Sequence, residues 1–348
     1  MTISVLDRRA PIEAATTRRR FLTGSALAVL VAGCGTAPTG SAPDPAAGSW
    51  SFTDDRGETV ELPTRPTRIA AYDTAGAALF FLGTPPVAVF GGSPIGQNPN
   101  LEGVDLTGIE SVGEVYGEID IEALAAAAPE LIVTAFDPRQ SGPVFGFVDG
   151  PVFDQVRQLA PIVAIDGTRD PLEVIGRFEE LAVALGGDVE APAVVAARQD
   201  YDDAAADLTA ALAEKPGLLA VAAYADPAEG VAFFRPAPSP GLRQLQGLGL
   251  SLVEPEGGSA DINEDFAGFF FDLVSLESAG KYPADLMLLD SRYDPAAMAG
   301  VATWAARPDV AAGQIVPYRA LESWSYQAYA GDFRTLAEAV RAADPDLV

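Results

Sequence analysis

Arginine and aromatic residues recur at the carboxyl ends of the expected strands. In open α/β sheets, ligands bind beyond these strand ends. There a guanidinium group can donate paired hydrogen bonds to oxygen atoms, and an aromatic ring offers apolar contact. The sequence therefore predicts a binding site for a small molecule, and the candidate residues are Tyr72, Arg139, Phe234, Arg235, Arg292, Tyr293, Trp324 and Tyr326.

Each of these assignments has an ordinary structural alternative. In so acidic a chain, an arginine can simply form a surface ion pair with one of many carboxylates. An aromatic side chain can pack in the core, and this is the favoured expectation for Phe234 and Phe270. The residue types alone leave both alternatives open.

The composition excludes several kinds of catalysis. The chain has no histidine and one cysteine, so a Ser-His-Asp triad, a Cys-His pair and a histidine-ligated metal site are all impossible. Asp73, Asp137 and Asp290 follow expected strands and could act as bases in an exported α/β enzyme. No G-x-S-x-G motif, phosphate-binding loop or paired-carboxylate motif accompanies them. We therefore expect a binding protein with no catalytic residues.

The chain is acidic and also rich in apolar residues. Its 348 residues carry a formal charge of −27, and 49% of them are hydrophobic. That length and apolar content suffice for two domains that each bury a hydrophobic core. The negative surface repels nucleic acid and anionic lipid headgroups, so no nucleic-acid partner is expected.

The first 33 residues have the features of an export signal. A basic cluster at Arg18, Arg19 and Arg20 precedes an apolar run, which is too short to span a bilayer and ends before Cys34. T-R-R-x-F-L resembles a twin-arginine signal, and L-V-A-G-C resembles the lipobox of bacterial lipoproteins. The resemblance implies cleavage before Cys34 and lipidation of its thiol. Residues 34–49 would then form a flexible tether; the alternative is a buried free cysteine.

The remaining sequence alternates strands and helices. A D-D-R-G turn within residues 49–60 predicts a β-hairpin. Apolar runs then predict strands at 68–72, 87–90, 131–135, 161–165, 218–224, 231–234, 251–253 and 314–317, and another in the apolar part of YPADLMLLD. Amphipathic patterns predict helices at 75–82, 120–128, 152–159, 172–185, 241–248, 304–310 and 332–343. Strand, helix and strand at this spacing form βαβ units.

The segment 188–215 predicts one long helix in the middle of the chain. It contains no glycine, Pro192 falls in its first turn, and Lys215, Pro216 and Gly217 end it. Similar segments flank it, EALAAAAPELIVTAFD before and ESAGKYPADLMLLDSRYD after. The alternative is an ordinary crossover helix within one sheet. We predict an α/β fold with two Rossmann-like lobes, residues 50–187 and 216–348, whose parallel-rich sheets are joined by this rigid helix.

The order of these segments resembles a known family. RIAAYDTAGAALFFLGTPPVAVFGG, VGEVYGEIDIEALAAAAPELIVTAF and VFDQVRQLAPIVAID precede the long helix, and YPADLMLLD and WSYQAY follow it. This series is similar to the iron-siderophore and cobalamin class of ABC-transporter substrate-binding proteins. The resemblance implies two lobes with a ligand in a shallow cleft between them, little hinge closure and no chemistry.

The resemblance also assigns roles to three further residues. It places Tyr116, in the VGEVYGE loop, in contact with the ligand. It implies that Asp154 and Glu277 pair with arginines of a membrane permease, although in an acidic chain either carboxylate can merely favour a helix N-terminus. The iron of a ferric siderophore is already coordinated, so no metal ligand and no cofactor is required of the protein.

These features together predict a monomeric receptor, anchored through Cys34 to the extracytoplasmic face of the cell membrane after export by the twin-arginine route. It would bind a ferric siderophore and deliver it to an ABC permease and its ATPase. Cobalamin, haem or another chelate is the alternative ligand, and an exported enzyme is the alternative class. Bare zinc or manganese is disfavoured because carboxylates alone suit such a site poorly.

Overall fold

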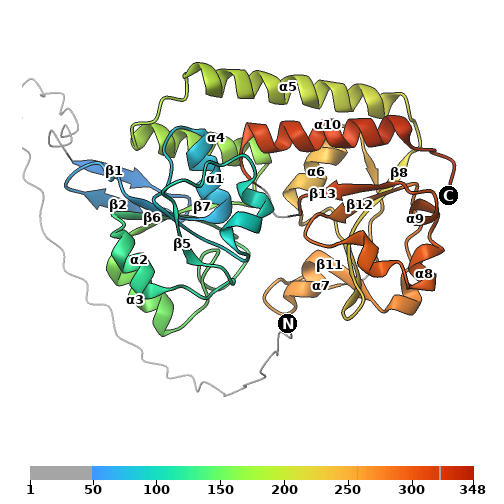
Figure 1. Ribbon diagram of the computed structural model, residues 1–348, viewed down its shortest axis with the longest axis horizontal. Helices are drawn as coiled ribbons and strands as arrows, with labels where there is room; N and C mark the ends of the chain where they lie inside the picture. Colours follow the sequence, from blue (N-terminus) through green and yellow to red (C-terminus); the bar gives the residue numbers. More distant parts are fainter. Residues whose placement is uncertain (1–48, 257, 321–322) are drawn as a thin grey trace, which may run out of the picture. The chain divides into compact units, whose positions relative to one another are not determined.

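The computed structural model divides the chain into two units, Met1–Asp44 and Pro45–Val348. The residues that it describes are 49–256, 258–320 and 323–348 (Figure 1). The expected signal peptide, Cys34 and all of the expected tether except Ser49 lie outside the described residues.

The first sheet has five parallel strands in the order β5-β4-β3-β6-β7. Their bounds are β3 (Ile69–Tyr72), β4 (Ala88–Phe90), β5 (Glu110–Gly113), β6 (Leu131–Phe136) and β7 (Ile162–Asp166). The helices around this sheet are α1 (Asp73–Phe81), α2 (Ile121–Ala127), α3 (Pro151–Leu159) and α4 (Pro171–Ala184). The central strands β3 and β6 are almost continuously buried, which is why they read as apolar runs without alternation.

A hairpin of β1 (Trp50–Thr53) and β2 (Thr59–Leu62) precedes this sheet, as the turn sequence predicts. The Asp54 carboxylate organises the turn, because it accepts hydrogen bonds from the backbone N–H groups of Arg56 and Glu58. The same carboxylate accepts the backbone N–H of Ala164 in β7, at 3.0 Å. One buried side chain therefore shapes the turn and fixes it to the sheet.

The predicted long helix is α5 (Pro192–Ala213), and Pro192 occupies its first turn. Its buried residues include Val194, Ala197, Tyr201, Ala204 and Leu208, which recur at the three- and four-residue spacing of one helix face. The final helix, α10 (Tyr326–Ala342), packs beside it (Figure 1). The helix predicted over 332–343 is therefore part of a longer helix that runs beside α5.

Ion pairs along this helix pair fix its register. Arg334 pairs with Asp200, and Arg341 pairs with Asp207 at 2.5 Å. The two arginines are two turns apart on α10, as the two aspartates are on α5. Because all four side chains are substantially exposed, these pairs specify alignment more than they stabilise the fold.

The second sheet is mixed, with the order β11-β9-β8-β12-β13 and β10 also paired to β8. Its strands are β8 (Leu219–Asp226), β9 (Gly230–Phe234), β10 (Ser251–Leu252), β11 (Phe271–Val274), β12 (Leu286–Asp290) and β13 (Ile315–Tyr318). Strands β9 and β11 run antiparallel to their neighbours. The parallel half, β8-β12-β13, corresponds to β3-β6-β7 of the first sheet. The similar segments that flank the central helix therefore contribute equivalent strands, β6 and β12.

Apart from α10, the helices of this second half have eight residues or fewer. They are α6 (Pro240–Gly247), α7 (Phe266–Phe270), α8 (Ala302–Ala305) and α9 (Pro308–Ala311), with short 3-10 turns η3 (Leu276–Ser278) and η4 (Pro295–Met298). The helix predicted over 304–310 is divided at Arg307, because the residue before a proline avoids the helical conformation. Arg307 is fully buried and forms an ion pair with Asp309 at 2.6 Å.

Candidate functional site

The carboxyl end of the first sheet carries four aromatic residues, which we call the first aromatic group: Tyr72, Phe90, Tyr116 and Phe145. Tyr72 is the last residue of β3, and its ring centroid lies 5.9 Å from Phe90, 6.4 Å from Tyr116 and 6.5 Å from Phe145. Tyr72 is 6% exposed, whereas Tyr116 is 48% exposed. Tyr116 therefore offers about half of its surface to solvent or to a ligand, next to a buried aromatic residue.

The second sheet carries a matching cluster, the second aromatic group: Tyr224, Phe234, Phe271 and Tyr293. Tyr224 stacks on Tyr293 with centroids 4.8 Å apart, and Phe234 meets Phe271 edge-on at 4.9 Å. Phe234 and Phe271 lie directly opposite each other in the antiparallel register of β9 and β11. Phe234 is buried, as the core alternative predicts, and it packs beneath the other three rings, which are half-buried.

The positive charge of Arg292 acts on tyrosines of both aromatic groups, Tyr72 in the first and Tyr224 and Tyr293 in the second. Arg292 follows β12, and Asp290 holds it through its backbone N–H and its guanidinium group, with Nη2 2.5 Å from Oδ2. The Asp290 side chain is fully buried, whereas that of Arg292 is 42% exposed. Burial raises the pKa of Tyr72, and the positive charge of Arg292 acts in the opposite direction. Arg292 is therefore close enough to the first aromatic group for its charge to act on Tyr72.

Arg139 repeats this arrangement at the equivalent position after β6. Asp137 accepts its backbone N–H at 2.8 Å, its Nε at 2.8 Å and its Nη2 at 2.7 Å. The guanidinium group lies 5.1 Å from the ring centroid of Phe269 and donates to the carbonyl of Pro238. Each sheet thus supplies an Asp-x-Arg pair whose arginine interacts with the opposite half of the molecule.

Arg235 is committed to the loop that leads to α7. Its Nη1 donates to the carbonyls of Ser259, Gly268 and Phe269 at distances of 2.9 to 3.3 Å. Its Nε is buried without a hydrogen-bond partner among the described residues. Arg235 therefore positions the loop beside the second aromatic group.

The comparisons with known proteins identify the family. The chain is 33% identical to DesE, a ferric-siderophore receptor protein from Streptomyces coelicolor, over 85% of this chain and 99% of that one, with a TM-score of 0.76. The chain is a member of the helical-backbone, class III family of ABC-importer substrate-binding proteins. A scan against models of protein families and a search of curated proteins find no match.

Two more distant structures share the fold of this family. FhuD2 from Staphylococcus aureus, with bound ferrioxamine B, is 19% identical over 79% of this chain and 98% of that one, with a TM-score of 0.55. The siderophore periplasmic binding protein of the fuscachelin gene cluster of Thermobifida fusca is 20% identical over 81% and 98%, with a TM-score of 0.57. Both confirm the predicted two-lobe α/β fold.

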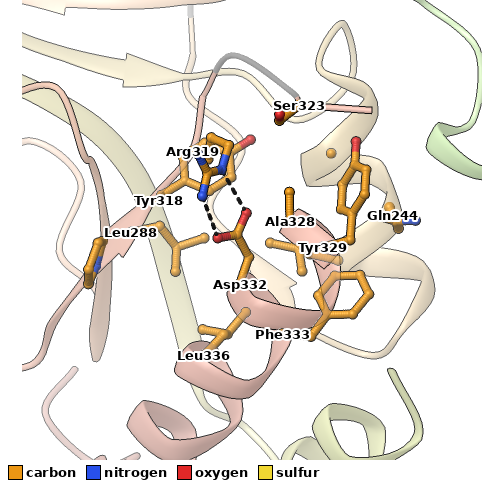
Figure 2. A pocket seen from close by; sticks show the side chains of 13 residues that line it. Gln244, Leu288, Tyr318, Arg319, Ser323, Ala328, Tyr329, Asp332, Phe333 and Leu336 are labelled. Atoms are coloured by element: carbon orange, nitrogen blue, oxygen red, sulfur yellow. Dashed lines mark hydrogen bonds and ion pairs between the residues drawn. The ribbon is translucent and has the colours of Figure 1, made fainter. Parts of the chain in front are cut away.

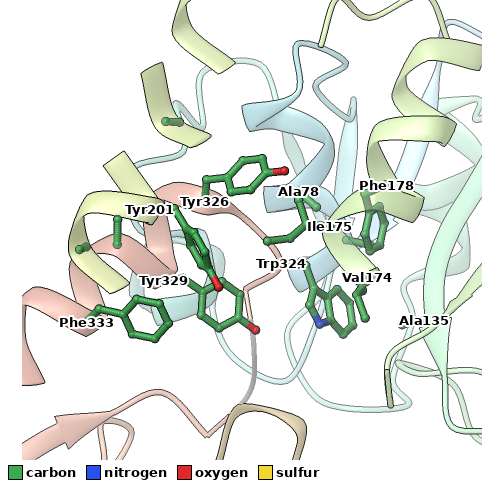
Figure 3. Close-up of a cluster of buried hydrophobic side chains, with 14 of the residues drawn as sticks. Ala78, Ala135, Val174, Ile175, Phe178, Tyr201, Trp324, Tyr326, Tyr329 and Phe333 are labelled. Carbon is green, nitrogen blue, oxygen red and sulfur yellow. The ribbon is translucent and has the colours of Figure 1, made fainter. Parts of the chain in front are cut away.

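Two residues predicted to contact a ligand are placed in packing between α4, α5 and α10. Trp324 is 4% exposed and stacks on Phe178, with ring centroids 5.5 Å apart (Figure 3). Tyr326 is 7% exposed, and its hydroxyl donates to Glu179 at 3.1 Å. The structure brings neither into the two aromatic groups, and their role in binding stays a prediction.

The two residues expected to meet a permease are both exposed. Asp154 lies in the first turn of α3, and Glu277 lies in η3 before β12. A hydrogen bond from Ser275 lowers the pKa of Glu277, so this residue carries its negative charge at neutral pH. Their role in docking stays a prediction.

A small cavity of about 40 Å³ lies beside the N-terminal half of α10 (Figure 2). Arg319 and Asp332 meet at one side of it, with Nε 3.3 Å from Oδ2. Arg319 also donates to the carbonyl of Pro99 and pairs with Glu102, at 3.1 Å, in the first half of the chain. The cavity is too small for a chelate, and its polar wall belongs to a link between the two halves.

The candidates named from the sequence include Tyr72, Tyr116, Phe234 and Tyr293 but not the other four aromatic residues. Phe90 ends an expected strand. Tyr224 ends an expected strand but lies within the longer β8, Phe271 begins a strand that was not predicted, and Phe145 lies in a loop. Their common signal is an aromatic residue close to an apolar run. Among the described residues there is no group of three or more acidic residues or cysteines that could hold a metal ion. No helix there is long and apolar enough to cross a membrane.

Proposed function

We propose that this protein is a lipid-anchored receptor on the extracytoplasmic face of the membrane, which binds a ferric siderophore between two lobes and delivers it to an ABC import permease. In this proposal residues 50–187 and 216–348 are the lobes, 188–215 is their connection, and Cys34 carries the lipid after twin-arginine export. The receptor acts as a monomer and catalyses no reaction.

The two aromatic groups and Arg292 carry this proposal. A ferric siderophore has a largely apolar periphery and chelating oxygens around the iron. Tyr116, Tyr224 and Tyr293 offer ring faces and edges for that periphery. Nη1 of Arg292 makes no hydrogen bond to the described residues and is available to donate to a chelating oxygen. The similarity to DesE supports the same ligand class.

Titration calorimetry tests the binding step directly. The full-length protein in detergent should bind at least one ferric siderophore at micromolar concentration or better, while the iron-free chelator binds more weakly. Cobalamin and haem serve as the alternative ligands. If no ferric siderophore binds, or if a chelate is turned over into products, the proposal is wrong.

Delivery to a permease is tested through the two exposed acids. The double variant Asp154→Ala, Glu277→Ala should abolish uptake of the radiolabelled ferric siderophore by cells and leave its affinity unchanged. Asp203→Ala combined with Glu338→Ala on the exposed faces of α5 and α10 is the matched control, since it removes the same charges elsewhere. Loss of affinity in the first variant would place these acids at the ligand instead.

A further inference from the structure

The arginines around the two aromatic groups are already neutralised. Arg292 is paired with Asp290, and Arg139 is paired with Asp137. Both carboxylates are almost completely inaccessible, with side-chain exposures of 0% and 2%, so neither can turn away to release its arginine. Nη1 of Arg235 donates its hydrogen bonds to backbone carbonyls of the α7 loop. The site therefore presents little net positive charge.

Acidic side chains lie at the strand ends and in the turn beside the second aromatic group: Asp226 ends β8 two residues after Tyr224, Glu229 lies in the turn to β9, and Asp290 ends β12. Burial raises the pKa of Tyr224 to about 12, with further contributions from Tyr293, Glu229 and Asp226, while Arg292 acts in the opposite direction. Burial likewise raises the pKa of Tyr293, and here Asp290, Glu229 and Asp226 reinforce the effect against the same arginine. One paired arginine therefore faces three carboxylates at this end of the site.

Neither of the two outer carboxylates has a cationic partner in the described part of the chain. The Asp226 carboxylate accepts only the backbone N–H groups of Ala228 and Glu229, at 2.7 and 3.2 Å. Glu229 is exposed in the turn between β8 and β9. Their negative charges are thus available to a ligand on the second aromatic group.

The first aromatic group adds no cation. Next to Tyr72, the buried carboxyl of Asp73 accepts the side-chain amides of Asn98 and Asn100 at 2.6 and 3.4 Å. Asp73 takes part in no ion pair with a described residue. The charged residues described at these strand ends and in the β8–β9 turn are three arginines and five acids, namely Arg139, Arg235, Arg292, Asp73, Asp137, Asp226, Glu229 and Asp290.

We infer that the ligand is a ferric chelate of zero or positive net charge, as three hydroxamate groups form, and not an anionic catecholate or carboxylate chelate. This inference rests on the proposed function. Three singly charged hydroxamates neutralise iron(III), whereas three doubly charged catecholates leave a trianion. Aromatic rings suit either periphery, so charge decides between them. A free ammonium group on the ligand would be attracted by Asp226 and Glu229.

The test compares four probes by titration calorimetry with the full-length protein in detergent. These are a neutral cyclic ferric trihydroxamate, a ferric trihydroxamate with one free ammonium group, a ferric tris-catecholate and ferric citrate. The two hydroxamates should bind at least about tenfold more tightly than either anion, as several unscreened charges at this range would produce. Added salt should weaken binding of the ammonium-bearing probe more than that of the neutral one.

Charge variants make the test specific. Glu229→Gln should weaken the ammonium-bearing chelate about threefold and leave the neutral chelate unchanged, the size expected for one charge near solvent. Glu338→Gln, an identical change on the exposed face of α10, should affect neither. If the catecholate or citrate binds most tightly of the four probes, the inference about ligand charge is wrong and the proposed function stands. Failure of all four probes to bind overturns the proposed function with it.

Discussion

At the scale of single residues, the two Asp-x-Arg pairs explain how an acidic chain keeps arginines in place. In each pair, the carboxylate accepts the backbone N–H of the arginine and two of its guanidinium nitrogens. The pairing fixes the direction of each long side chain before a ligand arrives, which lowers the entropy lost on binding. For Arg292, burial alone would lower the pKa, but Asp290 outweighs it and the pKa is raised.

The exposed ring of Tyr116 gives the first prediction. Tyr116→Ala should weaken ferric-siderophore binding by about 1 kcal/mol, or roughly fivefold, because one exposed aromatic contact is lost. Its thermal unfolding midpoint should stay close to that of the wild type, since the ring is already half exposed.

Tyr72→Ala is the matched comparison for this prediction. It removes a ring that is 6% exposed and should cost about 3 kcal/mol of stability, the range for large-to-small changes in a core. Calorimetric titration and thermal unfolding separate the two effects. A large stability loss in Tyr116→Ala with no change in affinity would show that this ring is structural.

At the scale of secondary-structure elements, the sequence predicts those whose signals are local. The buried runs of β3, β6 and β12 and the continuous α5 are predicted nearly as they occur. Strand β11 is not predicted because its sequence, FDLV, continues a run of phenylalanines from the short helix α7, and the strand pairs only with the antiparallel β9. A pairing of that kind depends on distant residues and leaves no local pattern.

The candidate site shows the same limit. The sequence makes Tyr72, Tyr116, Arg292 and Tyr293 candidates because each ends or follows a strand or occupies a loop known from the family; their role in binding stays a prediction. The position of Trp324 after the last strand does not predict its burial, because the ring on which it stacks, Phe178, is far away in sequence. An aromatic residue after the last strand suits a ligand or a core equally well until its neighbours are known.

The start of β3 gives a pH-dependent prediction. Glu130 accepts the backbone N–H groups of Thr67 and Arg68, and these hydrogen bonds lower its pKa below the ordinary value of 4.5. A lowered pKa means that the folded state favours the ionised form. The stabilisation is therefore complete above pH 4.5 and is lost as the pH falls through the lowered value.

The variant Glu130→Gln tests this link. Its thermal midpoint should be below that of the wild type at pH 7, and the difference should shrink steadily between about pH 5 and pH 3 as the wild-type carboxylate is protonated. Because Glu130 is exposed, the effect should be small. Glu338→Gln should show no such pH dependence, and a constant difference for Glu130→Gln across this range would contradict the assignment.

At the scale of the whole second unit, several contacts join the two halves besides α5. Ser323 donates to the carbonyl of Asn100 at 2.7 Å, Arg243 donates to the carbonyl of Thr168 at 2.9 Å, and Asn263 donates to the carbonyl of Arg139 at 2.8 Å. These donors lie at separate places around the site. Together with the paired helices α5 and α10, they oppose a wide opening movement.

The last prediction concerns this restraint. Small-angle scattering with and without the ferric siderophore should give radii of gyration that agree within about 1 Å, as for complexes whose partners are preorganised. The double variant Asn263→Ala, Arg319→Gln removes links between the halves at two places and should widen the difference. A large compaction of the wild type on binding would show that the contacts form only with the ligand. In that case the aromatic groups would be assembled by closure, and the affinity would include the cost of that movement.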